Sequence, residues 1–207
     1  MSQGSLAQRP RRTQEERSAA TRGRLLDATL ESLTEVGYTG TTTTGVCQRA
    51  RLSRGAQVHH FPKKADLVLS AVAHVASRQA DELRRRARSL PEGGDRLEPL
   101  LDLIAEAFSG PLFYAALELW VAARTDAELH RSLVAFERKA GRSMGELWRE
   151  LAGDLADAER FDEVLELTLH LSRGMALQKI LRPDDSARRR LLETWKAMAA
   201  AAVRNEN

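Results

Sequence analysis

Residues 41–67 read TTTTGVCQRARLSRGAQVHHFPKKADL, and this stretch decides how the rest of the chain is interpreted. Threonines 41–44 offer several N-caps for a short helix that should end near Ala50. After a turn of two residues, Ser53 is placed to cap a second short helix, which should end near His60 because a proline follows closely. The pattern predicts two short helices joined by a tight turn.

Longer helical patterns flank this stretch, and no part of the chain shows the sustained alternation of a strand. Upstream, an apolar stripe predicts a helix over residues 14–36, which Gly37 should end. Downstream, a long helix is predicted over residues 64–89, before the break Pro91-Glu92-Gly93-Gly94. Five more helices are expected over residues 95–109, 111–124, 126–152, 159–181 and 185–203. The chain is therefore predicted to be all-α, with about nine helices: a three-helix helix-turn-helix head and a larger C-terminal helical body.

The composition of the 207 residues is that of an ordinary globular protein, with 43% hydrophobic and 29% charged residues. A single cysteine excludes an intramolecular disulfide framework and fits a reducing compartment. No apolar leader follows the first basic residues, and no apolar run approaches the roughly 20 residues that a membrane span needs. We therefore expect a cytoplasmic protein that has no membrane partner.

Charge is distributed unevenly along the chain. Residues 1–64 contain eleven Lys and Arg against five Asp and Glu, a balance of +6 in a chain whose net charge is +3. A basic head on a mildly acidic body suggests a polyanionic partner for the head. Residues 1–13 are polar and basic, and we expect them to form a disordered arm. Its arginines, Arg9, Arg11 and Arg12, either reach into a minor groove or make no defined contact.

The second short helix carries side chains suited to the major groove of DNA. Arg54 can bond guanine O6 and N7, and Gln57 can bond adenine N6 and N7 in the same manner. Gly55 and Ala56 keep this turn small, so the backbone can approach DNA closely. Donors for the phosphate backbone are expected from His59, His60, Lys63 and Lys64, and from the threonines at the start of the preceding helix.

These motifs resemble the signature of tetracycline-repressor-type (TetR/AcrR) regulators. The resemblance covers about residues 20–70 without gaps in spacing, and it is carried by Gly37-Tyr38, Thr41 to Thr44, Leu52 to Ala56 and His59 to Leu67. It implies DNA contacts from Thr42, Thr43, Thr44, Arg54, Gly55, Ala56, Gln57, His59, His60 and Lys64. It also implies an arm at residues 1–13, a DNA-binding domain at 14–63, and a ligand-binding and dimerisation domain at 64–207.

Three positions depart from the family's pattern. Arg51 stands where the turn usually has glycine, and a positive φ at that position costs on the order of 1 kcal/mol for any other residue. Val58 stands where a tyrosine often touches phosphate. Gln57 stands where an apolar residue is more common, so it is either a base reader or a half-buried spacer.

No metal site or cofactor is expected. His59 and His60 are adjacent and point apart on a helix, and no Cys, Asp or Glu completes a plausible set of ligands with them. Cys47 should face the interior of the head as an inert thiol.

Aromatic and methionine side chains recur in the body. Each of them alone suits core packing, but as a group they are candidates for lining an apolar ligand cavity between helices. The predicted ligand-binding residues are Phe108, Phe113, Trp120, Phe136, Met144, Trp148, His170 and Met175.

The last two helices are candidates for a dimer interface, because the resemblance implies that they pair with their copies in a four-helix bundle. The predicted interface residues are Phe161, Leu165, Leu169, Ser172, Leu192, Trp195 and Ala199. Burial within the chain itself is the alternative. Dimerisation also has independent support, since one short recognition helix contacts too few base pairs for specific binding.

The leading functional hypothesis is a homodimeric repressor that leaves a palindromic DNA operator when a small, largely apolar effector binds. A regulator that activates, or that needs no ligand, is the alternative. A helical enzyme is the third reading, and it lacks a nucleophile–base constellation, a glycine-rich phosphate loop and HExxH or CxxC motifs.

Overall fold

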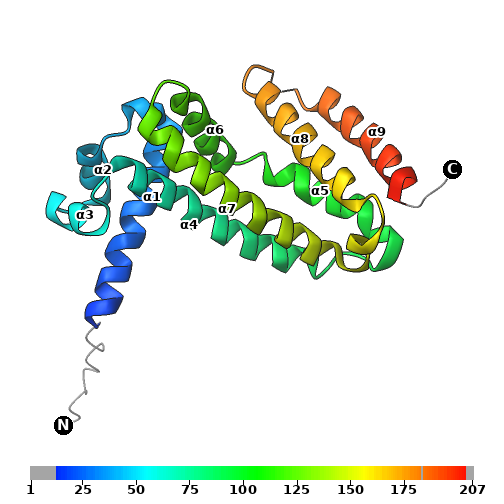
Figure 1. Ribbon diagram of the computed structural model, residues 1–207, viewed down its shortest axis with the longest axis horizontal. Helices are drawn as coiled ribbons and strands as arrows, with labels where there is room; N and C mark the ends of the chain where they lie inside the picture. The colour runs from blue at the N-terminus through cyan, green and yellow to red at the C-terminus, as the bar shows by residue number, and fades with distance from the viewer. Residues whose placement is uncertain (1–12, 183, 204–207) are drawn as a thin grey trace, which may run out of the picture. The chain divides into compact units, whose positions relative to one another are not determined.

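The computed structural model describes residues 13–182 and 184–203, and all regular structure in these ranges is helical (Figure 1). The predicted all-α fold is confirmed, and the predicted breaks lie within a few residues of the observed ones. The predicted arm lies outside the described residues except for Thr13. The α-helices are α1 Gln14–Gly40, α2 Thr43–Ala50, α3 Arg54–His60, α4 Lys64–Ala87, α5 Leu97–Ala107, α6 Pro111–Ala123, α7 Ala127–Ala152, α8 Phe161–Lys179 and α9 Ser186–Val203. Two 3-10 segments, Gly93–Arg96 and Gly153–Asp157, precede α5 and follow α7.

Contacts along the chain divide it into two compact units within α4, one ending at Ala71 and the next beginning at Val72. We call them the head and the body. The division lies two helical turns beyond the boundary expected between residues 63 and 64. The first two turns of α4 therefore pack with the head.

The head is built on α1, which begins with a capping box: Thr13 Oγ1 accepts from Glu16 N at 3.1 Å, and Glu16 Oε2 accepts from Thr13 N at 2.9 Å. The regular helix is interrupted at Gly37, whose φ of 68° suits glycine, and helical turns continue to Gly40. The head core contains Leu25, Leu26, Ala28, Val46, Ala50, Phe61, Leu67 and Ala71. This core packs α2 and the start of α4 against α1, and Phe61 anchors the end of α3 in it.

Arg51 closes α2 in the left-handed conformation, with φ 53° and ψ 48°. Its N–H donates to Gln48 O at 3.1 Å, and the N–H of Leu52 donates to Cys47 O at 2.9 Å, which satisfies the last carbonyls of the helix. Arg24 Nη2 also donates to the carbonyls of Ala50 and Arg51. The sharp turn before α3 thus rests on a conformation that a side chain with Cβ resists.

Replacing Arg51 with glycine is therefore expected to raise the free energy of unfolding of the head by about 1 kcal/mol. Chemical denaturation followed by circular dichroism measures this. Arg51→Ala is the control, because it removes the same charged side chain but keeps the Cβ atom. A gain of equal size in Arg51→Ala would show that charge, and not backbone strain, is responsible.

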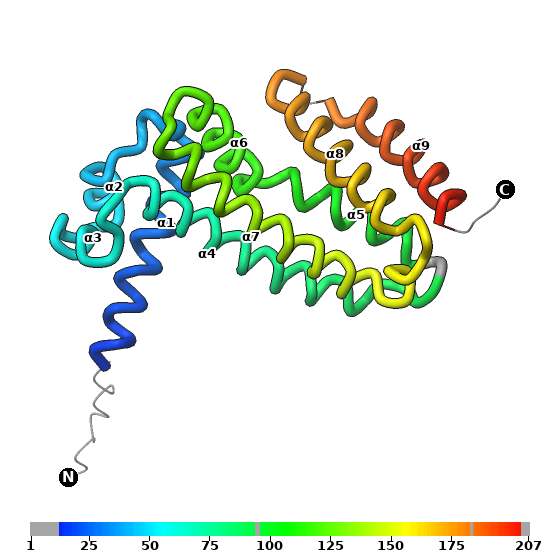
Figure 2. Tube along the Cα trace, in the orientation of Figure 1, coloured from blue at the N-terminus to red at the C-terminus, as the bar shows by residue number. Residues whose placement is uncertain are grey.

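The body has its own core, in which α5, α7, α8 and α9 meet. Trp148 is fully buried there, with Leu100, Leu101, Ile104 and Phe161. Figure 2 shows α8 and α9 running side by side in opposite directions. One buried charge is well paired: Lys196 Nζ lies 2.7 Å from Asp102 Oδ1 and 2.8 Å from Glu193 Oε1.

The described residues contain no single helix that is long and apolar enough to cross a membrane. Only α5 and α6 taken together, with a bend of 58° between them, reach the length and hydropathy of a span.

Candidate DNA-binding surface and effector cavity

The start of α2 is capped by Thr42, whose Oγ1 accepts from Gly45 N at 3.0 Å. Thr42 and Thr44 are exposed and Thr43 is half-buried, so the start of α2 lies at the surface of the head. Thr41 is buried instead, and its Oγ1 donates to Gly37 O at 2.8 Å. Thr42, Thr43 and Thr44, which were predicted to contact DNA, are thus at least partly exposed, whereas Thr41 has a structural role in the core.

The start of α3 is capped by Ser53, whose Oγ accepts from Ala56 N at 3.2 Å. Arg54, Gly55 and His59 are exposed on this helix, and Ala56 is half-buried. A Cβ atom added at Gly55 would meet nothing closer than Ser53 Oγ at 3.8 Å, so the surface beside it is open. A short, rigid helix with an exposed arginine in its first turn is the arrangement that a major groove accepts.

Gln57 was predicted to be able to contact a DNA base, and the structure corrects this prediction. Its side chain is 2% exposed, and Nε2 donates to the carbonyl of Phe61, which ends α3. This amide holds the end of the helix and has no free edge for a base. The sequence allowed Gln57 to be either a buried spacer or a residue that contacts a base. Its burial agrees with the first interpretation and not with the second.

His60 and Lys64 lie at the junction of α3 and α4, and both are half-buried. Burial lowers the pKa of the His60 imidazole, and the nearby His59 and Arg22 lower it further. Lys64 Nζ donates to Tyr38 O at 2.6 Å and lies 4.0 Å from the centroid of the Tyr38 ring. Lys64 therefore ties the start of α4 to the end of α1.

Cys47 is buried in α2, as predicted. Burial raises the pKa of its thiol, against an opposing effect of the positive charge of Arg54. The thiol is therefore protonated at neutral pH and is a poor nucleophile.

In the body, a cavity of about 150 Å³ opens among α4, α5, α6, α7 and α8. Six of the eight predicted ligand-binding residues line it: Phe108, Phe113, Trp120, Phe136, Met144 and Trp148. The other two do not. His170 is exposed on α8, and Met175 is buried outside the lining.

Three polar lining residues were missed by the sequence analysis: Gln79, Glu137 and Arg173. Gln79 Nε2 donates to Ala107 O at 2.9 Å, and Trp120 Nε1 donates to Glu137 Oε1 at 2.8 Å. A signal for Gln79 was present, because it shares a helical stripe with Val72, Ala76 and Leu83. A polar residue in such a stripe indicates a buried partner or a ligand.

The structure also corrects the predicted dimer residues on α8 and α9. Phe161, Leu165, Ser172 and Ala199 are buried within the chain, so they have no surface to offer a partner. Leu169 and Trp195 pack against the same core, and Trp195 Nε1 donates to Thr168 Oγ1 at 2.8 Å. Leu192 is half-buried. These residues form the inner faces of the two helices.

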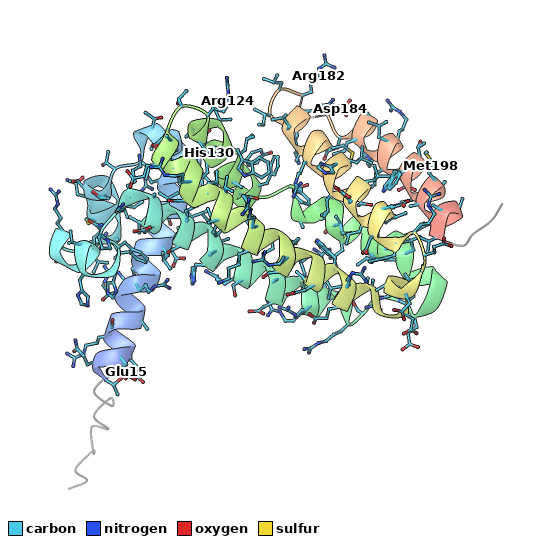
Figure 3. All side chains as sticks on the ribbon, viewed as in Figure 1. Glu15, Arg124, His130, Arg182, Asp184 and Met198 are labelled. Carbon is cyan, nitrogen blue, oxygen red and sulfur yellow. The ribbon has the colours of Figure 1, made fainter. Side chains whose placement is uncertain are left out.

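The outer faces of α8 and α9 carry different apolar residues. Along α8 the exposed stripe is Leu167, His170, Gly174 and Leu177, and along α9 it is Leu191, Thr194, Met198 and Ala201. Leu177 is 50% exposed and Met198, which is labelled in Figure 3, is 60% exposed. In both stripes the spacing alternates between three and four residues, so each forms one continuous face.

A capped two-helix turn with an exposed arginine, held on a third helix and followed by a helical body with an apolar cavity, defines a helix-turn-helix DNA-binding protein. Residues 25–71 match the family model described as bacterial regulatory proteins, tetR family. The HTH-type transcriptional regulator CymR of Pseudomonas putida is 33% identical over 180 residues, which cover 84% of this chain and 86% of CymR. The chain therefore belongs to the tetR family of DNA-binding transcription regulators, and the alternative of a helical enzyme is set aside.

Solved structures agree with this assignment. A transcriptional regulator from Pseudomonas aeruginosa PAO1 has a TM-score of 0.64 at 26% identity, with 95% of this chain and 97% of that chain covered. A regulator from Saccharomonospora viridis, solved in complex with choline, has a TM-score of 0.61 at 14% identity, with 91% and 97% covered. The second likeness concerns the fold alone.

Proposed function

We propose that this protein is a homodimeric repressor that binds a palindromic operator and leaves it when a small, largely apolar effector enters the body cavity. The observation that carries the proposal is the exposed first turn of α3, where Arg54 and Gly55 stand clear of the fold next to a serine cap. Arg54 reads a base, while Thr42, Thr44 and His59 contact the flanking phosphates.

The dimer forms through the outer faces of α8 and α9. An exposed stripe of leucine and methionine beside small residues is a costly surface for an isolated chain, and a second copy covers it by two-fold symmetry. His170 lies on this face, which gives the residue a place in the interface and not in the ligand site. Two copies of α3 then read two half-sites, whose centres are one helical turn of DNA apart or a near multiple, about 34–36 Å per turn.

Effector binding is coupled to DNA through α4, which belongs to both units. Val72, Ala76 and Leu83 of this helix line the cavity, while Lys64 at its start is bonded to Tyr38 in the head. An effector that binds one position of α4 more tightly than another shifts the population of the head conformation that fits DNA. A difference of about 1–3 kcal/mol between the two states is typical of such coupling.

The test is fluorescence anisotropy with the DNA upstream of the protein's own gene, followed by footprinting and by titration with small apolar compounds. The expected result is two protected half-sites, two chains per site, and release by at least one compound. Indifference to duplex DNA in dilute salt overturns the proposal. A reporter assay distinguishes repression from activation of transcription. If the bound protein increases transcription, it is an activator and not a repressor.

Lys64→Ala is expected to weaken binding to all DNA sequences alike and to reduce the slope of log Kd against log salt by about one unit. The reason is the loss of one positive charge at the start of α4, at a position that the proposal places beside a phosphate. Lys64→Arg keeps the charge and should keep the slope. A slope unchanged in Lys64→Ala would restrict this residue to its bond with Tyr38.

A further inference from the structure

Two residues that line the body cavity carry buried N–H groups that have no acceptor among the described residues. They are Trp148 Nε1 and Arg173 Nε, and both side chains line the cavity. Trp148 has no exposed surface, so bulk solvent does not hydrate its indole N–H. A buried donor without a partner costs about 1–3 kcal/mol, which makes such groups rare unless a ligand completes them.

The cavity also contains a positive charge that is not neutralised. The guanidinium of Arg173 lies 5.5 Å from the ring centroid of Phe108 and 5.7 Å from that of Trp120. No carboxylate among the described residues forms an ion pair with it. Glu137, the acidic residue of the lining, accepts instead from the indole N–H of Trp120. The electrostatic character of the cavity is therefore set by Arg173.

From these two features we infer that the effector is a small organic anion, with a carboxylate or similar acidic group on an apolar body the size of one aromatic ring. This rests on the proposed function, in which the cavity is the effector site. An acidic group supplies acceptors for Trp148 and Arg173 and a charge opposite to the guanidinium. A cavity of about 150 Å³ lined by apolar side chains is of the size that holds benzene, so one ring fills it.

A cationic effector fits this cavity poorly, although aromatic side chains often surround quaternary ammonium ligands. Arg173 already lies over two of the aromatic rings, and its charge repels a second cation. Glu137 has one oxygen engaged by Trp120. The same lining would thus suit an ammonium ligand only if Arg173 moved away.

The experiment compares benzoate, benzamide and benzylammonium, three probes that share one ring and differ in charge. Binding to the full chain, without DNA, is measured by quenching of tryptophan fluorescence and by the shift of the melting temperature. Benzoate is expected to bind at least about tenfold more tightly than benzamide, and benzylammonium more weakly than both. Tighter binding of benzylammonium, or no binding of benzoate at its highest soluble concentration, overturns the inference.

Two variants test whether Arg173 and Trp148 are responsible for the preference for benzoate. Arg173→Gln should reduce the preference for benzoate over benzamide by about tenfold, whereas Arg142→Gln, on the exposed face of α7, should leave it unchanged. Trp148→Phe removes the indole N–H and should weaken the binding of benzoate while leaving the binding of toluene little affected. A benzoate preference that survives both Arg173→Gln and Trp148→Phe contradicts the inference. Because DNA is absent, a negative result here leaves operator binding by the unliganded protein standing, and the two failures are told apart.

Discussion

Replacing Arg54 with alanine is expected to weaken operator binding about 10- to 100-fold and to relax the preference at one base pair of each half-site. Arg54 opens α3, is exposed, and follows the serine that caps the helix, so its guanidinium reaches outward without supporting the fold. A bidentate arginine–guanine contact contributes about 1–3 kcal/mol of discrimination against the wrong base. The measurement is anisotropy with a panel of half-sites in which each position is varied in turn.

Arg51→Ala is the matched control for this experiment. It removes the same charge from the turn just before α3, where the side chain is also exposed. This variant should weaken binding to all DNA sequences to a similar extent and leave the base preferences intact. If Arg54→Ala behaves in the same uniform manner, Arg54 contacts phosphate and does not read a base.

If the proposed dimer forms through the outer faces of α8 and α9, replacing Leu177 with glutamate is expected to convert it to a monomer and to abolish specific operator binding. Leu177 is half exposed in the single chain, so the substitution leaves the monomer folded. In the proposed dimer, two-fold symmetry would place two unpaired carboxylates in one apolar interface, and each unpaired buried charge costs about 3–5 kcal/mol. Sedimentation velocity across a range of concentrations measures the assembly, and anisotropy measures the DNA binding.

Val121→Glu serves as the control, since Val121 is similarly exposed on α6, outside the proposed interface. It should remain dimeric and bind the operator normally. A Leu177→Glu protein that still sediments as a dimer would place the interface elsewhere. Met198→Glu on α9 gives an independent check of the same face.

Much of the head could be predicted from the sequence because its signals are local. Thr42 and Ser53 are caps that act within one turn of the chain, and Gly37 marks a break that needs a positive φ. The turn at Arg51 has the left-handed geometry that its position implied, even though the residue there is not glycine. Local rules of this kind are satisfied or violated within a few residues, and a linear sequence displays them.

The faces of the later helices could not be predicted in the same way. In α8, Leu165 and Met175 are buried while Leu167 and Leu177 are exposed, so apolar residues occupy two sides of one helix. Periodicity identifies a stripe, but it does not state which of two stripes faces the chain's own core. Only the packing of α8 against α5 and α9 makes that choice.

Long-range polar contacts were also invisible in the sequence. Lys64 was expected at phosphates, but its bond to Tyr38 joins residues 26 positions apart. Arg173 was not among the predicted site residues, although it lies four residues after Leu169 and three before Ala176, on the stripe that faces inward. Its importance became clear only once its aromatic neighbours were known.

The burial of Cys47 has a practical consequence for experiments on this protein. The sequence contains one cysteine, and its thiol is both enclosed and protonated at neutral pH. A new cysteine at an exposed position such as Val58 would therefore be the preferred target of a maleimide dye, with no need to remove the native one. The natural chain is already a suitable background for attaching a single spectroscopic label beside the recognition helix.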